Sequence, residues 1–529
     1  MISESIGIKH ECVFYHNMGI PSYYKKLVTI LPSLIRRSHP SIGIDWLFMD
    51  FNCLIYHCLH RADTPVYPGD HQKEEWEAQF IECIVRYCIK IIRQVDPKLG
   101  VFLAIDGVVP MAKMRQQRLR RFKSVWLQQQ EKKGEVKWDT NAITPGTLFM
   151  KKLHAGLEKM IKEKGKGTWR LSSSDEPGEG EHKIMSAWRT GLYTGPAAVY
   201  GLDADLIVLS LLGQTDQPIW QAIQPIWLFR EEIEMGKIAY DSAGEEQMEW
   251  FSIDVLRDWL SSESQDKRSF ILDYCFAMSI LGNDFLPSSL GLKMRDDGHT
   301  ELLTVLRDPK RVPLVNCSKI SIEGLQYLFR TLSCNEETRI QKYIGKKQYF
   351  SRGAQETDLG QNNWPLHHIE EEILLDSQKR ALAPKWKEKY KGLFSSYSRA
   401  IEQYLYGIQW IWAYYTGKLE DVCFNWYYPF SLPPLWESLR TAPLPVFPLN
   451  VLVRAQDIQP VEQLALVLPL ESWSLIPPCK ERKFPTLAPQ FYPSVYSFES
   501  MGKRFFWECE SMIPLPSMYE LKRIIEASL

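Results

Sequence analysis

Three short, mostly apolar runs in the first half of the chain indicate buried β-strands. They cover residues 44–49, 101–105 and 197–202, and an acidic residue follows each run directly. A run of this length before a turn signal is typical of a strand that is covered on both faces. Up to about residue 300 such runs alternate with helical patterns. This alternation predicts an α/β fold with a mostly parallel central sheet flanked by helices.

The rest of the chain follows different patterns. Residues 301–395 are more polar and less regular, which predicts a variable linking region. From about residue 396 the pattern is helical and aromatic, and after Trp426 prolines become frequent. Frequent prolines favour extended segments, so we expect residues 396–529 to form a helical and extended C-terminal region that wraps onto the core. Residues 1–17 are predicted to be an extension ahead of a core over residues 18–300.

Acidic residues recur in five short contexts, three of which follow the apolar runs. The seven residues are Asp50, Asp106, Glu179, Glu181, Asp203, Asp205 and Asp284. Because sites in open α/β sheets lie beyond the carboxyl ends of the strands, we expect these carboxylates to converge on one crevice. Carboxylate oxygens suit Mg²⁺ or Mn²⁺. Without a cation, so many neighbouring acids would repel one another.

Each acid taken alone has an ordinary explanation. A single Asp at a strand end is more often a turn or helix cap than a ligand. Glu179 and Glu181 are also compatible with acids favoured by a helix dipole at the start of a helix. The recurrence of five acidic contexts in this order favours the metal site, because caps have no reason to recur in this way.

A basic segment, residues 111–123, follows Asp106 closely and contains six cationic residues and no acid. Pro110 and the helix-forming residues after it predict a helix. Four potential phosphate donors would share one face of that helix: Lys113, Gln117, Arg120 and Arg121. Arginine binds phosphate through two hydrogen bonds and lysine supplies a point charge, so this face suits a terminal phosphate. The alternative is a solvated surface helix, which most charge runs are.

Two aromatic residues are candidates for stacking on nucleobases. Tyr56 lies six residues after Asp50, and Trp410 lies in the helical aromatic segment. Stacking on aromatic rings is a common way to hold a single strand. From spacing alone, a place in the hydrophobic core is the better interpretation for both residues.

Composition narrows the class of protein without naming a substrate. The chain has 529 residues, 45% of them hydrophobic, and a formal net charge of −1, so any nucleic-acid binding must come from a local patch. No apolar run is long enough to span a membrane. The first residues do not resemble a signal peptide. Eleven cysteines without a zinc-like spacing predict reduced thiols and a cytoplasmic protein.

Several of these segments together resemble the XRN family of 5′→3′ exoribonucleases. The first group of motifs is MGIPSYY (18–24), AIDGVVPMAKMRQQRLRR (104–121), PGEGEHKIM (177–185), GLDADL (201–206) and LGNDFLP (281–287). The family's second conserved region is matched in order by WK (386–387), GIQW (407–410), NWYYP (425–429), EQL (462–464), VLP (467–469) and QFYP (490–493). The resemblance extends from about residue 18 to the C-terminus, and its longest motifs are specific.

The resemblance implies a flap-nuclease or PIN-like core that carries two Mg²⁺ or Mn²⁺ ions on all seven acids. It also implies that the basic helix forms a 5′-monophosphate pocket from Lys113, Gln117, Arg120 and Arg121. The implied activity is processive 5′→3′ degradation of 5′-monophosphorylated single-stranded RNA to mononucleotides by two-metal hydrolysis. We expect a monomer, with decapping or other RNA-decay proteins as candidate partners.

Two features depart from the family pattern. The family stacks the first bases between a histidine and a tryptophan. The tryptophan corresponds to Trp410, but the histidine position holds Tyr56, with His57 next to it. A shift of one residue would restore a histidine. The residues before Met18, where the family usually begins, are the second departure.

Two other functions compete with this interpretation. One is a structure-specific 5′ nuclease that acts on DNA flaps, from the same broad class of metal nucleases. The other is a catalytically inactive RNA-binding scaffold. The second conserved region and the basic helix favour the exoribonuclease, and the seven intact acids argue against the scaffold.

Overall fold

A computed structural model describes residues 22–130, 136–165, 167–215, 224–234, 237–316, 319–353, 364–376, 381–446 and 453–528. The predicted extension before Met18 and the motif at residues 18–21 lie outside these ranges. The chain forms two compact units. Unit 1 comprises residues 1–26, 260–452 and 495–512, and unit 2 comprises residues 27–259, 453–494 and 513–529. These boundaries differ from the predicted ones, because the chain leaves the predicted core near residue 260 and returns to it after residue 452.

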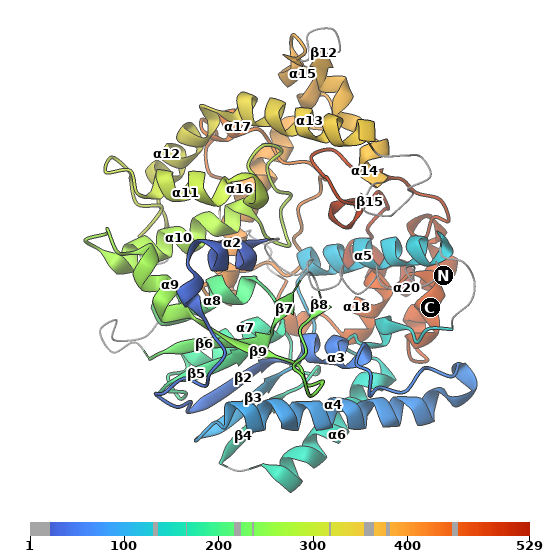
Figure 1. Ribbon diagram of the computed structural model, residues 1–529. Coiled ribbons are helices and arrows are strands. Elements are labelled where there is room, and N and C mark those ends of the chain that lie inside the picture. The colour runs from blue at the N-terminus through green and yellow to red at the C-terminus, as the bar shows by residue number, and fades with distance from the viewer. Residues whose placement is uncertain are drawn as a thin grey trace, which may run out of the picture. The chain divides into compact units, whose positions relative to one another are not determined.

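Unit 2 is built on a seven-stranded sheet in the order β1-β9-β6-β5-β2-β3-β4 (Figure 1). Neighbouring strands from β6 to β4 are parallel, whereas β9 and β1 are antiparallel additions at one edge. The strands are β1 (Ile35–Arg36), β2 (Trp46–Asp50), β3 (Gly100–Ala104), β4 (Thr168–Ser172), β5 (Ala197–Tyr200), β6 (Ile226–Glu231) and β9 (Met248–Ser252). The predicted α/β class with a mostly parallel central sheet is therefore confirmed.

The three apolar runs form neighbouring central strands, as expected. All residues of β2, β3 and β5 are buried, because helices cover the sheet. The helices of this part of unit 2 are α3 (Phe51–Leu59), α4 (Lys73–Val95), α5 (Met111–Gln130), α6 (Leu148–Lys164), α7 (Gly180–Arg189), α8 (Asp205–Thr215) and α9 (Ile253–Leu260). Helix α8 is buried along its whole length, which explains why its sequence is apolar on every face.

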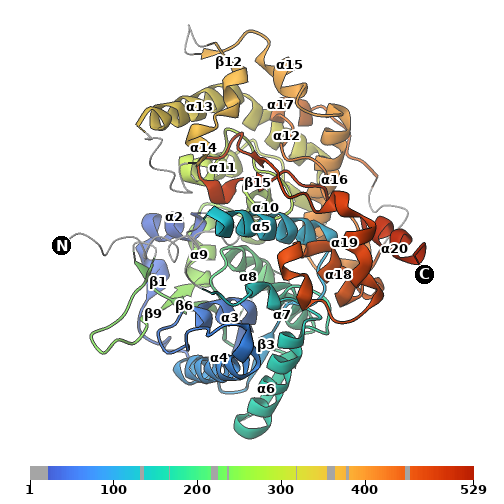
Figure 2. The same cartoon turned by 90° about the vertical axis from the view of Figure 1, so that its right-hand side faces the viewer.

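The C-terminal segments of unit 2 pack against the basic helix α5. They contain α18 (Pro460–Val467), α19 (Phe484–Leu487) and α20 (Met518–Glu526), which gather near one end of α5 (Figure 2). Arg118 holds these segments together from inside. Its side chain is 0% exposed and donates to the carbonyl oxygens of Leu466 (2.9 Å), Pro514 (3.2 Å) and Phe491. One arginine of the basic segment 111–123 is thus a structural anchor.

We expect Arg118→Met to lower the free energy of unfolding by about 3 kcal/mol, because three buried carbonyl oxygens would lose their donor. Urea unfolding measures this change, and proteolysis should cut residues 453–494 first. Gln129→Met, at an exposed position of the same helix, is the matched control. Equal stability of the two variants would contradict the anchoring role.

Unit 1 is mainly helical. Its helices are α10 (Lys267–Leu281), α11 (Gly298–Leu306), α12 (Ile322–Ser333), α13 (Glu336–Gly353), α14 (Trp364–His367), α15 (Trp386–Lys391), α16 (Tyr397–Tyr415) and α17 (Trp436–Leu439). Short two-stranded pairs complete it, including β14 (Phe498–Glu499) with β15 (Glu510–Ser511). The helical and aromatic pattern after residue 396 is α16, which buries most of its aromatic side chains. None of the helices within the described ranges is long and apolar enough to cross a membrane.

Candidate active site

The carboxyl ends of β2, β3 and β5 bring four of the predicted ligand contexts together in unit 2. Asp50 is the last residue of β2, in register with Ala104 at the end of β3. Asp106 follows β3 by two residues, and Asp203 follows β5 by three. Glu179 is the N-cap residue of α7, whose first turn contains Glu181. The topology predicted from the apolar runs therefore places these acids at one edge of the sheet.

Two sets of side chains lie close enough to share a cation. Ligand atoms of Asp50, Asp106 and Glu181 lie within 4.8 Å of one another, and so do those of Glu179, Glu181 and His182. Glu181 belongs to both sets and joins them. Carboxylate oxygens with one imidazole are a donor set that Mg²⁺ or Mn²⁺ accepts. The residues present therefore fit a divalent metal site.

His182 was not predicted as a ligand from the sequence. Burial lowers the pKa of its imidazole well below the usual value, so the ring is neutral and able to donate a lone pair to a metal. The only signal in the sequence was its place directly after Glu181. A histidine at that position is more often structural than a ligand, so spacing alone could not select it.

The pKa values of Asp50 and Glu181 are raised because these carboxyl groups are buried close to other acids. Burial is the largest cause that raises the pKa of Asp50 well above its usual range, and the charges of Asp106 and Asp203 add to it. Burial and the neighbouring Glu179 likewise raise the pKa of Glu181. A divalent cation would relieve this repulsion and displace the protons that these groups retain.

Neighbouring polar groups fix Asp106. The side-chain amide of Asn52 donates to its Oδ2 at 3.0 Å, and the backbone N–H of Gly180 donates to its Oδ1 at 2.7 Å. Lys183 stabilises the backbone next to Asp106 by donating to the carbonyl oxygens of Ile105 (2.6 Å) and Ser173 (2.7 Å). Asn52 and Lys183 were not singled out from the sequence, because neither side chain carries the negative charge by which the candidate ligands were selected.

Gly180 lets the start of α7 approach the acids closely. A Cβ atom at this position would lie 2.7 Å from Asp50 Oδ1 and 3.0 Å from the carbonyl oxygen of Ala104. Both contacts are too short for an alanine without movement of Asp50 or of the α7 N-terminus. The glycine is therefore a requirement of the site geometry.

We expect Gly180→Ala to weaken Mn²⁺ binding by about tenfold, because the new methyl group displaces Asp50 or withdraws the N–H that holds Asp106. Calorimetric titration of the intact protein with Mn²⁺ measures this loss. Gly191→Ala, at an open position just after α7, provides the comparison, with stability checked because its φ is positive. Unchanged Mn²⁺ affinity in Gly180→Ala would show that the close approach is not needed.

The two remaining acids differ in their placement. Asp205 begins α8, is 6% exposed, and donates its backbone N–H to Asp203 Oδ1 at 3.0 Å. This contact keeps Asp205 beside an acid of the cluster. Asp284 lies in unit 1, in the turn after α10, where Asn283 Oδ1 accepts the N–H groups of Phe285 and Leu286. Its role as a seventh ligand stays a prediction.

The basic helix begins directly beside the acids. Lys113 Nζ lies 2.5 Å from Glu179 Oε2, so this ion pair links α5 to the acids. Gln117 is buried and accepts a hydrogen bond from Gln463 of α18 at 3.4 Å. Arg120 is exposed. The predicted helix is thus confirmed. The face predicted to bind phosphate is partly buried rather than fully exposed to solvent.

Arg121 is the most unusual cation on this helix. It is 7% exposed, and its Nη2 donates to Thr144 Oγ1 at 2.8 Å, whereas its Nη1 is buried without a hydrogen-bond partner among the described residues. Burial lowers the pKa of the guanidinium to about 10, so it still carries its charge at neutral pH. A buried, charged donor with an unused N–H suits an anion such as phosphate.

The two residues at the family's histidine position differ in placement. His57 is 2% exposed and lies 3.8 Å from Glu231 Oε1 and 3.7 Å from Glu246 Oε1. It belongs to a buried polar cluster in which Tyr87 and Tyr200 also donate to Glu231, at 2.6 and 2.7 Å. Tyr56 is only half-buried, and its hydroxyl is near enough to influence the pKa of Arg121. Of the two, only Tyr56 remains a candidate for stacking.

The placement of Trp410 corrects its predicted role. The side chain is 0% exposed in unit 1, its indole N–H donates to the carbonyl oxygen of Cys423 at 2.9 Å, and its ring packs against Phe285, Tyr414 and Trp426. Neither face of the ring is free to receive a base. Trp410 is a core residue, which is the alternative that its spacing favoured.

Comparisons with known proteins show which family the chain resembles. Residues 18–219 match the model of the XRN 5′-3′ exonuclease N-terminus. The chain is 26% identical to human 5′-3′ exoribonuclease 1 over 96% of its own length and 34% of that protein. It is 28% identical to 5′-3′ exoribonuclease 2 of Saccharomyces cerevisiae over 70% of the chain and 44% of that protein. The chain thus spans between a third and a half of these relatives.

Among solved structures, the bacteriophage T5 flap endonuclease is similar at 10% identity and a TM-score of 0.26, over 57% of this chain and 88% of that one. So low a score carries no argument about fold or function. The match to the family model covers the acids from Asp50 to Asp205 and the whole of α5. Together with the similarity to the exoribonucleases over most of the chain's length, it supports the resemblance to the XRN family.

Proposed function

We propose that this protein is a metal-dependent 5′→3′ exoribonuclease that degrades 5′-monophosphorylated single-stranded RNA to mononucleotides. One observation carries the proposal. Lys113 of the basic helix contacts Glu179 of the acid cluster at 2.5 Å, and this contact supports one continuous site for the proposed phosphate-binding cations and metal-binding acids. A nuclease that counts from a 5′ end needs this adjacency, because the terminal phosphate and the scissile phosphate are one nucleotide apart.

The acids would hold two divalent ions, Mg²⁺ or Mn²⁺, through the two sets that share Glu181. When bound, such ions supply a more acidic water and positive charge for the leaving oxygen. Asn52 and the N–H of Gly180 orient Asp106 in the geometry that a ligand requires. Asp205 is proposed as a further ligand beside Asp203, and Asp284 is proposed as the seventh ligand.

The basic helix would bind the 5′-monophosphate. Arg121 Nη1 supplies an unused donor, Lys113 supplies a point charge, and Gln117 and Arg120 complete the donor set. A site closed by buried side chains would exclude caps and triphosphates. After each cleavage the new 5′ phosphate would enter the same site, which accounts for processive degradation.

Tyr56 would stack on a base near the 5′ end. Its ring is half-buried, and Tyr56 is among the groups that act on the pKa of Arg121, the residue proposed to bind the phosphate. Stacking contributes about 1–3 kcal/mol per base and does not read sequence. We therefore expect weak sequence preference.

We retain the cytoplasm as the expected compartment, supported by cysteines that form no disulfide among the described residues.

Substrate comparison tests the proposal. Single-stranded RNA with a 3′ label and a 5′-monophosphate, the same RNA with a 5′-hydroxyl, and a DNA flap of matched sequence are incubated with the protein and Mg²⁺ or EDTA. The proposal predicts rapid loss of only the phosphorylated RNA, and only with Mg²⁺. Preferred cleavage of the DNA flap would support the structure-specific nuclease instead, and metal-independent RNA binding without cleavage would support the scaffold.

A further inference from the structure

A pocket in unit 1 is separate from the acids and the basic helix of unit 2. It is a cavity of about 370 Å³ between the segment that precedes β12 (Leu375–Asp376), the end of α15, residues 430–432 and the β14–β15 pair. Its floor is apolar and belongs to the main core of the unit through Phe394, Leu432 and Met501. A volume of this size can take one or two side chains or a small ligand.

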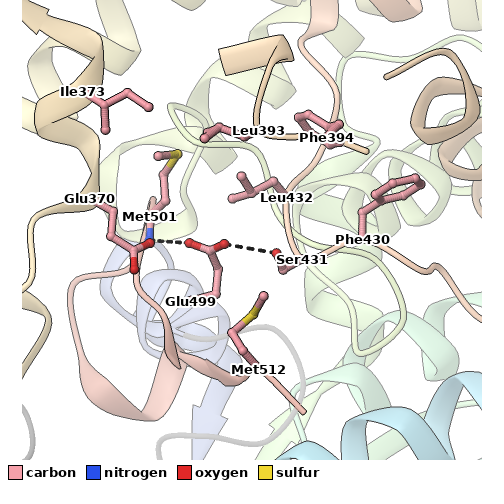
Figure 3. A pocket seen from close by; sticks show the side chains of 10 residues that line it. All are labelled: Glu370, Ile373, Leu393, Phe394, Phe430, Ser431, Leu432, Glu499, Met501 and Met512. Carbon is pink, nitrogen blue, oxygen red and sulfur yellow. Dashed lines mark hydrogen bonds between the residues drawn. The ribbon is translucent and has the colours of Figure 1, made fainter. Parts of the chain in front are cut away.

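Two carboxylates meet in this apolar pocket (Figure 3). Glu499 accepts the backbone N–H of Met501 at 3.0 Å and the hydroxyl of Ser431 at 3.1 Å, so its orientation is fixed. Glu370 accepts the backbone N–H of Ser500 at 3.3 Å and turns toward Glu499. The pocket thus has an apolar wall and a pre-oriented acidic end.

The acidic end lacks a cation of its own. The residues that line the pocket in the described part of the chain include these two acids and no base. The nearby Glu371 is neutralised by Lys347 at 2.9 Å, and both side chains are almost fully buried. Burial and the proximity of Glu499 raise the pKa of Glu370 to about 8, so at neutral pH the pair retains a proton where a cation could bind.

The rim of the pocket is unusually apolar for a protein surface. Ile373, Leu393 and Met512 are 41%, 42% and 48% exposed and all line the same cavity. Clustered exposed apolar side chains mark surfaces that bind other proteins, and methionine adapts well to an incoming side chain. Because this apolar rim extends around the cavity, it favours an occupant with side chains on either side of the inserted group.

We propose that this pocket docks a segment of a partner protein that inserts a lysine or arginine between the two glutamates and flanks it with apolar side chains. The apolar stem of the inserted residue would lie along Phe394, Leu432 and Met501. Its cationic end would replace the proton that Glu370 and Glu499 share. The inference goes beyond the proposed nuclease activity and does not depend on it.

Peptide binding to the whole protein tests this inference. The probes are acetyl-Leu-Lys-Leu-amide, the same peptide with norleucine in place of lysine, and butylamine, each titrated by calorimetry without RNA or metal. We expect the lysine peptide to bind with a dissociation constant on the order of 0.1 mM and the norleucine peptide to bind at least about tenfold more weakly. Equal binding of the two peptides would overturn the role of the acids. Butylamine binding as tightly as the lysine peptide would overturn the assignment of a protein segment.

A double variant, Glu370→Gln with Glu499→Gln, should remove the preference for the lysine peptide. Glu372→Gln is the matched control, because it removes an exposed charge from the same short helix, Glu370–Leu374, outside the pocket. The control should keep the full preference, and a preference retained by the double variant would contradict the inference. RNA degradation by both variants should match that of the unaltered protein, so failure here is distinguishable from failure of the proposed function.

Discussion

Replacing Asp203 and Asp205 together with alanine should lower the rate of RNA degradation by at least about 1,000-fold and leave much of the RNA binding intact. The charge of Asp203 raises the pKa values of both Asp50 and Glu181, so it acts on both of these acids. Asp205 is held against it through its backbone N–H. Loss of two carboxylates removes the charge that would hold the divalent ions, and removal of essential metal charge costs several kcal/mol of transition-state stabilisation.

Single-turnover degradation of phosphorylated RNA measures the rate, and fluorescence anisotropy measures binding. The matched control is Glu158→Ala with Glu163→Ala, which removes two exposed acids from α6. The control should degrade RNA at the original rate. Full activity in the Asp203 and Asp205 variant would overturn the assignment of the acids as metal ligands.

Replacing Arg121 with alanine should narrow the preference for 5′-monophosphate over 5′-hydroxyl RNA by about 10- to 100-fold. The lost interaction is a charge-assisted hydrogen bond in a buried site, which typically contributes about 1.5–3 kcal/mol. The rate on 5′-hydroxyl RNA should change little, because that substrate has no phosphate for the guanidinium to bind. The ratio of kcat/KM values on the two substrates measures the effect.

The variant Arg121→Lys separates two contributions to the 5′-phosphate preference, the positive charge and the planar shape of the guanidinium. Lysine keeps a positive charge but not the planar pair of donors, so its preference should lie between those of the original protein and Arg121→Ala. Arg93→Ala, an exposed arginine of α4, is the control for loss of charge. A ratio that stays the same in Arg121→Ala would exclude the phosphate role of this helix face.

The parts of the fold that follow from local patterns were predictable. Continuous apolar runs occur where both faces of a strand are covered, so β2, β3 and β5 could be located within two residues. Parallel neighbours bring their carboxyl ends to one edge, and this geometry alone gathers Asp50, Asp106 and Asp203. The helix predicted over residues 111–123 followed from Pro110 and the strong helix formers after it, and the observed helix continues to Gln130.

Features that depend on distant packing were not predictable. Arg118 belongs to the same charge run as Arg121, yet its donors are used by carbonyl oxygens that lie 348 to 396 residues away in the chain. Helical spacing assigned Arg121 to the predicted phosphate-binding face and left Arg118 outside it, but spacing could not show which segments cover Arg118. Trp410 shows the same limit. The family resemblance suggested an indole ring exposed for base stacking, but the packing of unit 1 buries that ring completely.

The most direct test of the central claim is the identity of the products released from 5′-monophosphorylated RNA in the presence of Mg²⁺. If the acids and the basic helix form one site that measures a single nucleotide, mass spectrometry should detect nucleoside 5′-monophosphates from the earliest times, while the remaining RNA shortens only from its 5′ end. Early oligonucleotide products, or shortening from the 3′ end, would contradict the account.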